Sequence, residues 1–233
     1  MLILSLDTTT RRSSCALVRD GVVVCETVGD PSGAHATRLP GDLMALLAQA
    51  EVTVAEIDVC AVATGPGSFT GLRIGIATMQ GLAFAAGKPL VGVSGFDALA
   101  LLGCEVMAEG PEARSAPSVR IATWVDAWRG EVFAALYENG VEIEPPVVTS
   151  PELLFRALAG RPTLFIGDGA VSCRDRILQA MPGEARFAEP VAASLAGAVG
   201  RIAASHTVLP PPHEIRPLYV RRPDAELLRE RPV

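Results

Sequence analysis

The chain has 233 residues, of which 49% are apolar, and its formal net charge is −6. This composition suits one large or two small folded domains and excludes a disordered chain. The negative charge disfavours nucleic-acid binding through a broad basic surface, and no uninterrupted apolar run reaches the roughly 18 residues of a membrane span. Because Met1 leads directly into an apolar strand without a signal-like segment, we expect a cytoplasmic protein with no membrane partner.

The first predicted elements are strands over Leu2–Leu6, Ser14–Arg19 and Val22–Val28. The pair Asp20-Gly21 is a strong hairpin signal, because both positions of such a turn favour positive φ. A helix is predicted from His35 to about Ala50, with Pro40 in its first turn and its leucines on one face. The start of the chain is therefore an antiparallel meander followed by a helix.

A glycine-rich stretch, Gly65–Gly75, follows a short apolar strand over Val59–Ala63 and leads into a helix that ends at Gly87. A P-loop needs a lysine beside its last glycine, and Lys88 is the only lysine in the chain. The dinucleotide fingerprint needs a glycine at its sixth position, where this stretch has Thr70. Neither standard nucleotide loop is present.

The predicted helix over residues 70–86 has two apolar faces. Its glycines cost stability relative to alanine, so we expect them to permit close backbone approach to another element. The bulkier face needs a second layer, which could be a neighbouring helix or another chain. The small-residue face comprises Gly71, Gly75, Thr78, Gly81 and Ala85, and the bulkier face comprises Leu72, Ile76, Met79 and Ala83.

The second half repeats the order of strands joined by tight turns and then alternating helix and strand. A polar, proline-bearing segment over residues 109–117 marks the predicted boundary. We therefore predict two similar α/β domains, over residues 1–109 and 110–209, and an exposed tail over 210–233, although no convincing internal repeat is visible. Five scattered cysteines are expected to be reduced core thiols.

Several motifs occur together in the order seen in the bacterial TsaB (YeaZ) proteins, and the chain resembles that family over nearly its whole length. The most specific is the glycine-rich stretch GPGSFTGLRIG. The motifs are Ile3–Thr9, His35–Pro40, Gly65–Gly75, Asp126–Val132 and Pro217–Arg221.

This resemblance implies an actin-like, sugar-kinase-like (ASKHA, ribonuclease H-like) fold. It also implies a role in making N6-threonylcarbamoyladenosine at position 37 of tRNAs that read codons beginning with A. In that family the protein is a non-catalytic scaffold for TsaD, the metal-bearing transferase, and TsaE, an ATPase, joins them. No cofactor or metal is expected here, because His35 has Leu39 where a second histidine of a TsaD-type pair would stand.

The expected interface with TsaD consists of the apolar faces of the two helices in the first half. The same patch could form a homodimer when the partner is absent, and tRNA would be reached through the complex. For Arg73, an interface residue and a solvated arginine are both open interpretations. The predicted interface residues are His35, Leu39, Leu43, Leu72, Arg73, Ile76, Met79, Gln80 and Ala83.

Two polar turns, Asp7-Thr8-Thr9 and Asp168-Gly169, follow strands at positions where actin-like kinases hold nucleotide. A structural turn is the favoured interpretation of each, and a vestigial nucleotide loop remains open. The alternative function is an independent ATP-dependent phosphotransferase that uses Asp7.

Overall fold

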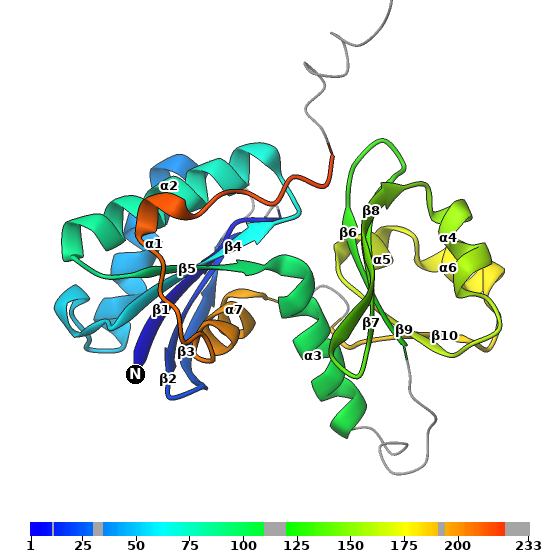
Figure 1. Cartoon of the computed structure of the whole chain (residues 1–233), viewed down its shortest axis with the longest axis horizontal. Coiled ribbons are helices and arrows are strands. Elements are labelled where there is room, and N and C mark those ends of the chain that lie inside the picture. The colour runs from blue at the N-terminus through cyan, green and yellow to red at the C-terminus, as the bar shows by residue number, and fades with distance from the viewer. Residues whose placement is uncertain (11, 30–34, 110–119, 191–193, 222–233) are drawn as a thin grey trace, which may run out of the picture.

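The computed structural model describes residues 1–10, 12–29, 35–109, 120–190 and 194–221, as two α/β domains side by side (Figure 1). The first sheet has the order β3-β2-β1-β4-β5. Its strands are β1 (Leu2–Asp7), β2 (Ser14–Arg19), β3 (Val22–Val28), β4 (Val59–Gly65) and β5 (Leu90–Ser94). The hairpin between β2 and β3 has φ of 49° at Asp20 and 80° at Gly21, which confirms the predicted turn.

The second sheet has the order β10-β9-β6-β7-β8, which is the same arrangement. In each domain the first three strands are antiparallel, and the fourth and fifth run parallel to the first. The two predicted similar domains are confirmed at the level of topology. The strands are β6 (Arg120–Asp126), β7 (Val132–Glu138), β8 (Val141–Thr149), β9 (Thr163–Ile166) and β10 (Ala185–Phe187).

Helices make three layers around the two sheets. The outer layer of the first sheet consists of α1 (His35–Gln49) and α2 (Phe69–Ala86). The middle layer consists of α3 (Gly95–Glu109) and α7 (Ala196–Ala203), which share one core cluster with both sheets (Figure 1). The outer layer of the second sheet consists of α4 (Pro151–Leu158), α5 (Asp168–Ser172) and α6 (Arg174–Ala180).

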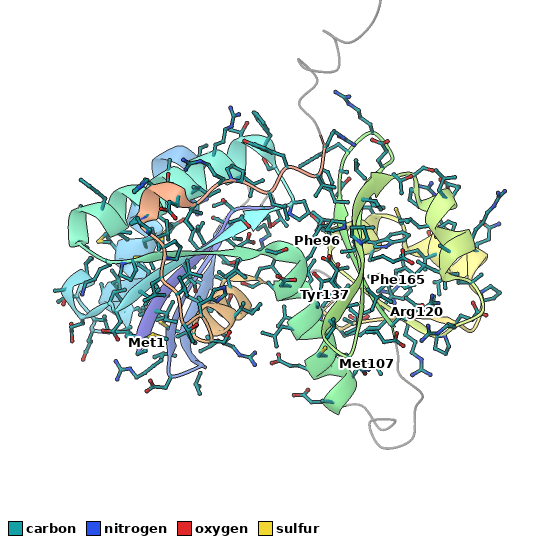
Figure 2. The ribbon with its side chains drawn as sticks, in the orientation of Figure 1. Met1, Phe96, Met107, Arg120, Tyr137 and Phe165 are labelled. Carbon is teal, nitrogen blue, oxygen red and sulfur yellow. The ribbon has the colours of Figure 1, made fainter. Side chains whose placement is uncertain are left out.

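The two domains are joined through α3 by apolar packing and a partly buried hydrogen bond. Phe96 on α3 and Tyr137 on β7 lie in the same core cluster, at the contact between the domains (Figure 2). The Tyr137 hydroxyl donates to Asp97 Oδ1 at 2.6 Å. A contact of this kind fixes the relative position of the sheets more firmly than a mobile linker would.

The predicted second-domain range of 110–209 needs correction, because the chain returns to the first domain before residue 196. Helix α7 packs on β1 and β2, and Ser5 Oγ donates to the Ala196 carbonyl at 2.7 Å. A Cβ on Gly200 would lie 2.5 Å from Val18 Cγ2, so this glycine permits the close packing.

The predicted exposed tail also needs correction over its described part. Ile215, after the short 3₁₀ helix η2 (Pro212–Glu214), belongs to the core of the first domain. Gln80 on α2 donates to the carbonyl oxygens of Pro212 at 2.8 Å and Ile215 at 3.2 Å. Further along, Arg221 donates to the Ala127 carbonyl of the second domain at 2.9 Å. The tail arginines at 222, 229 and 231 lie outside the described residues.

Two local differences remain in the helices. Pro40 lies inside α1, whose first residue is His35, and so falls beyond the predicted first turn. Another short 3₁₀ helix, η1 (Val54–Glu56), precedes β4. By contrast, α2 ends at Ala86 as predicted, with Gly87 in the left-handed conformation at φ 64°. It begins at Phe69, one residue before the predicted start, where Ser68 Oγ accepts from the Gly71 amide at 3.2 Å.

Candidate functional site

The glycine-rich stretch packs against the threonine turn that follows β1. The Ser68 amide donates to the Thr9 carbonyl at 2.8 Å, and Thr8 Oγ1 donates to the Gly71 carbonyl at 2.9 Å. A Cβ would lie 2.4 Å from the Thr8 carbonyl oxygen if built on Gly71, and 2.1 Å from Thr8 Oγ1 if built on Gly75. The expectation that the glycines of the helix permit close approach is confirmed for Gly71 and Gly75. It is wrong for Gly81, where a Cβ would meet nothing within 4 Å.

This packing decides what the loop can do chemically. Phosphate loops hold anions with free backbone amides at a helix N-terminus. Here the Ser68 amide is bonded to Thr9 and the Gly71 amide to the Ser68 side chain. The glycines therefore serve contact between two elements of the first domain.

A cleft of about 490 Å³ lies between the domains, at the carboxyl ends of the central strands. Asp7 ends β1, and Asp126 ends β6, which is the equivalent strand of the second domain. Asp168 Oδ1 accepts from the Asp126 amide at 2.9 Å, so both carboxylates belong to the second wall. The two polar turns identified in the sequence thus line one cavity, although Asp7 and Asp168 are 161 positions apart in the chain.

The symmetry of the fold extends to two glycines at the ends of equivalent strands. Gly65 ends β4 with φ 117°, and Gly167, which follows the equivalent strand β9, has φ 110°. A Cβ on Gly167 would lie 2.2 Å from the Trp124 carbonyl oxygen, so the backbone there approaches its neighbour closely. Gly169 is buried beside Asp126, and a Cβ there would lie 3.0 Å from the Asp126 amide nitrogen.

The cleft carboxylates are electrostatically strained. The pKa of Asp7 is raised from 3.8 to about 6, mainly because the carboxyl group is buried. Hydrogen bonding from Thr9 lowers this pKa, and the charges of Asp168 and Glu26 raise it, and the value of about 6 includes all of these effects. Burial likewise raises the pKa of Asp168, and the Asp126 charge acts in the same direction. Negative charge in this cleft is therefore costly until a cation or a proton compensates it.

Replacing Asp7 with asparagine is expected to stabilise the isolated protein near neutral pH. Since the pKa of Asp7 is higher in the folded state, the folded state binds more protons between about pH 4 and 6, and stability falls as pH rises through this window. The penalty at pH 7.5 is on the order of 3 kcal/mol. Urea unfolding of Asp7→Asn should show a gain of up to that size at pH 7.5 and almost none at pH 4.

The exposed Asp175 on α6 provides the matched control, because Asp175→Asn removes the same charge outside the cleft. That variant should change stability by a few tenths of a kcal/mol at either pH. A loss of stability for Asp7→Asn at pH 7.5 would contradict the assignment of a costly buried charge.

The structure places the predicted partner face of α2 inside the chain's own core, which corrects that surface assignment. The side chains of this face are at most 4% exposed, namely Leu72, Ile76, Met79 and Ala83. The last three pack in the cluster formed with the first sheet and α1. Leu39 and Leu43 of α1 are each 1% exposed in the same cluster. The bulky side chains fill the layer over β1 and β4, so they are unavailable to a partner in this conformation.

The other predicted interface residues have mixed positions. Arg73 is exposed, Gln80 is half-buried under the tail, and the side chain of His35 lies outside the described residues. Near the N-terminus of α2, the Arg73 guanidinium lies 3.8 Å from the Phe69 ring centroid, and its Nε donates to the Tyr219 hydroxyl at 3.0 Å. Arg73 is therefore held in place between α2 and the tail rather than free in solvent.

The exposed side of α2 is a different stripe, which the sequence analysis missed. We call it the outer stripe, and its members recur at intervals of three or four residues. Ala77 and Gly81 are small, and a Cβ on Gly81 would meet nothing within 4 Å. Phe84 at the far end is 83% exposed. The outer stripe comprises Thr70, Arg73, Ala77, Gly81 and Phe84.

Comparison with known proteins identifies the family. The family model described as TsaD, tRNA N6-adenosine threonylcarbamoyltransferase, matches residues 29–205. The tRNA threonylcarbamoyladenosine biosynthesis protein TsaB of Bacillus subtilis is 30% identical over 173 residues, which cover 72% of this chain and 71% of that protein. The chain belongs to the TsaB (YeaZ) family.

Other similar proteins include a solved YeaZ structure and two mycobacterial proteins. YeaZ from Pseudomonas aeruginosa has a TM-score of 0.73 at 26% identity, covering 94% of this chain and 99% of that structure. The uncharacterized protein Rv3421c of Mycobacterium tuberculosis is 34% identical, covering 97% of this chain and 94% of that protein. The chain spans only 56% of the length of ML0378 of Mycobacterium leprae, to which it is 31% identical over 97% of its own residues. The predicted actin-like class of two similar α/β domains is confirmed.

The described part of this TsaB-family chain contains no group of three or more His, Cys, Asp or Glu side chains placed to hold a metal ion. Among its described helices, none combines the length and apolar character needed to cross a membrane. His206 and His213 both lie exposed near the tail.

Proposed function

We propose that this chain acts in the synthesis of N6-threonylcarbamoyladenosine in tRNA, as a non-catalytic scaffold subunit that binds TsaD in the cytoplasm. Membership of a family whose named members are tRNA threonylcarbamoyladenosine biosynthesis proteins carries the proposal. TsaE would join the pair, and tRNA that reads codons beginning with A would be reached through the complex.

The outer stripe of α2 supports binding of another helix. Ala77 and Gly81 lie one helical turn apart and leave room for a close approach, while Phe84 and the Arg73–Phe69 pair provide large side chains at the two ends. Interfaces commonly combine such arginine and aromatic residues around a closely packed centre. The stripe therefore suits helix–helix packing between subunits.

A TsaD subunit is a suitable source of that helix. Because the TsaD family model matches residues 29–205 of this chain, a TsaD subunit is expected to carry helices equivalent to α1 and α2. Two related subunits would then pair through equivalent surfaces, and two copies of this chain could pair in the same way without TsaD.

The cleft chemistry supports a non-catalytic role over the alternative of an independent ATP-dependent phosphotransferase. Two amides of the glycine-rich loop, those of Ser68 and Gly71, are bonded within the chain. Among the described residues lining the cleft, the carboxylates of Asp7, Asp126 and Asp168 face one basic side chain, Arg12. This balance of charge repels a triphosphate that carries no bound cation.

Replacing Ala77 with arginine tests the proposal, because it places a large charged side chain at the centre of the outer stripe. TsaD binding is expected to weaken by about 100-fold or more, as at a disrupted interface centre. The melting temperature of the isolated chain should stay within about 2 °C of the parent protein, because Ala77 is exposed. Binding is measured by calorimetry with purified TsaD.

A reconstituted tRNA modification reaction with TsaD, TsaE and threonylcarbamoyl-adenylate tests whether the chain is required for modification. Omitting the chain should abolish modification, and Ala77→Arg should approach that result. Leu153→Arg is the matched control, since Leu153 is 64% exposed on α4 of the second domain. Normal TsaD binding by Ala77→Arg would refute the outer-stripe interface, and full modification without the chain would refute the scaffold role.

A further inference from the structure

The cleft between the domains presents carboxylates on two opposite walls. Asp7 belongs to the first domain, while Asp126 and Asp168 belong to the second. Among the described cleft residues Arg12 is the one basic side chain, and it is exposed. Coulomb interactions within a partly enclosed cavity favour a positively charged ligand over an anion.

A buried hydroxyl gives independent support for a ligand. Thr9 lines the cleft, is 2% exposed, and its Oγ1 makes no hydrogen bond of good geometry. The Thr9 side chain also lies close enough to the Asp7 carboxylate to lower the pKa of Asp7. Buried polar atoms normally find partners, so this acceptor is available to an N–H donor placed in the cleft.

The size and lining of the cavity favour an organic cation over a metal ion. Its volume of about 490 Å³ is within the range of small-molecule sites and far larger than an ion needs. The carboxylates do not form a group of three placed for a metal among the described residues. Buried apolar side chains line the same cavity, namely Leu99, Val125 and Leu195.

We propose that the interdomain cleft binds an aliphatic di- or polyamine, with one ammonium group at Asp7 and Thr9 and another at Asp126 and Asp168. The hydrocarbon chain between the ammonium groups would contact Leu99 and Val125. Trp128 also lines the cleft, and an indole ring attracts a cationic group placed over its face. Each ammonium would form charge-assisted hydrogen bonds, which are among the stronger ones in proteins.

Calorimetric titration of the isolated full-length chain with spermidine tests this site. We expect saturable one-to-one binding tighter than about 1 mM, because two or more charge-assisted bonds contribute. Asp7→Asn and Asp168→Asn should each weaken binding by at least about tenfold, since each removes the charge from one wall. Asp175→Asn, outside the cleft, should leave the affinity unchanged.

Titration with butylamine, which has a single ammonium group like a lysine side chain, tests whether the ligand must span both walls. Butylamine should bind at least about tenfold more weakly than spermidine, because it reaches one wall only. Equal affinities for the two amines, or equal spermidine binding by the parent protein and Asp168→Asn, would overturn the proposal. The proposal would also be overturned if NaCl at the same ionic strength gave the same calorimetric signal as spermidine.

These outcomes are independent of the scaffold function, because neither TsaD nor tRNA is present. Urea unfolding at pH 7.5 shows whether Asp7→Asn loses spermidine binding through misfolding, because this variant is expected to be more stable than the parent protein. A variant that becomes more stable and yet loses spermidine has lost a binding group rather than its fold.

Discussion

Replacing Gly75 with alanine is expected to destabilise the protein by about 2–4 kcal/mol, the range of a core overpacking that also disturbs a buried hydrogen bond. In an ordinary helix the same change gains about 1 kcal/mol. Here the added Cβ would lie 2.1 Å from Thr8 Oγ1 and 3.0 Å from Thr8 Cγ2. Thr8 is fully buried and its hydroxyl is bonded to the Gly71 carbonyl, so it cannot move aside cheaply.

Gly81 provides a control on the same helix. A Cβ at Gly81 meets nothing within 4 Å, so Gly81→Ala should stabilise the isolated chain by up to about 1 kcal/mol. Urea unfolding of both variants at one pH gives the comparison. If both changes act in the same direction, the close packing of the threonine turn on α2 is not what constrains Gly75.

A double variant tests the contact directly. Thr8→Ala removes Oγ1 and Cγ2, the two Thr8 side-chain atoms nearest to the added methyl group. Combining it with Gly75→Ala should cost less than the sum of the single changes, with a coupling of about 1 kcal/mol or more. Strict additivity would place the cost of Gly75→Ala somewhere other than Thr8.

Features set by local chemistry could be predicted from the sequence. Asp20-Gly21 forms its hairpin, and α2 stops at Gly87, because turn and cap preferences involve only a few neighbouring residues. Strand β10 and helix α5 have three and five residues, too few for a hydrophobic period to appear. The position of α7 on the first sheet depends on tertiary packing, which a local pattern does not contain.

The faces of α2 show where periodicity stops being informative. Helical spacing groups residues into faces, but it does not say which of two apolar faces is buried within the subunit. The bulky face fills the core, and Gly71 and Gly75 receive the threonine turn. One signal could have located the outside: Arg73 is the only charged residue of α2, and Ala77, Gly81 and Phe84 follow it on the same stripe.

The cleft was predicted only as two separate turns. Asp7 and Asp168 come together because the two domains repeat one topology and face each other at the ends of β1 and β6. Sequence similarity between the halves is too weak to reveal this symmetry. The position of Thr9, a buried hydroxyl without a partner, depends on packing and has no sequence signal.

Replacing Met79 with glutamate is expected to unfold the protein, with a loss of more than about 4 kcal/mol, because it buries an unpaired charge. Met79 on α2 is 0% exposed and packs in the core that α1 and α2 form with the first sheet. Ala77→Glu, two residues earlier on the outer stripe, should keep the native circular dichroism spectrum, and Met79→Leu should cost less than about 1.5 kcal/mol.

Both glutamate variants are expected to lose TsaD binding, but for different physical reasons. In Met79→Glu the loss should parallel the unfolded fraction measured by urea titration, whereas in Ala77→Glu it should occur in a fully folded chain. The decisive result would be a folded, monomeric Met79→Glu that fails to bind TsaD. That would mean that the bulkier face of α2 becomes exposed and contacts the partner. The outer stripe would then be an ordinary solvent-facing surface.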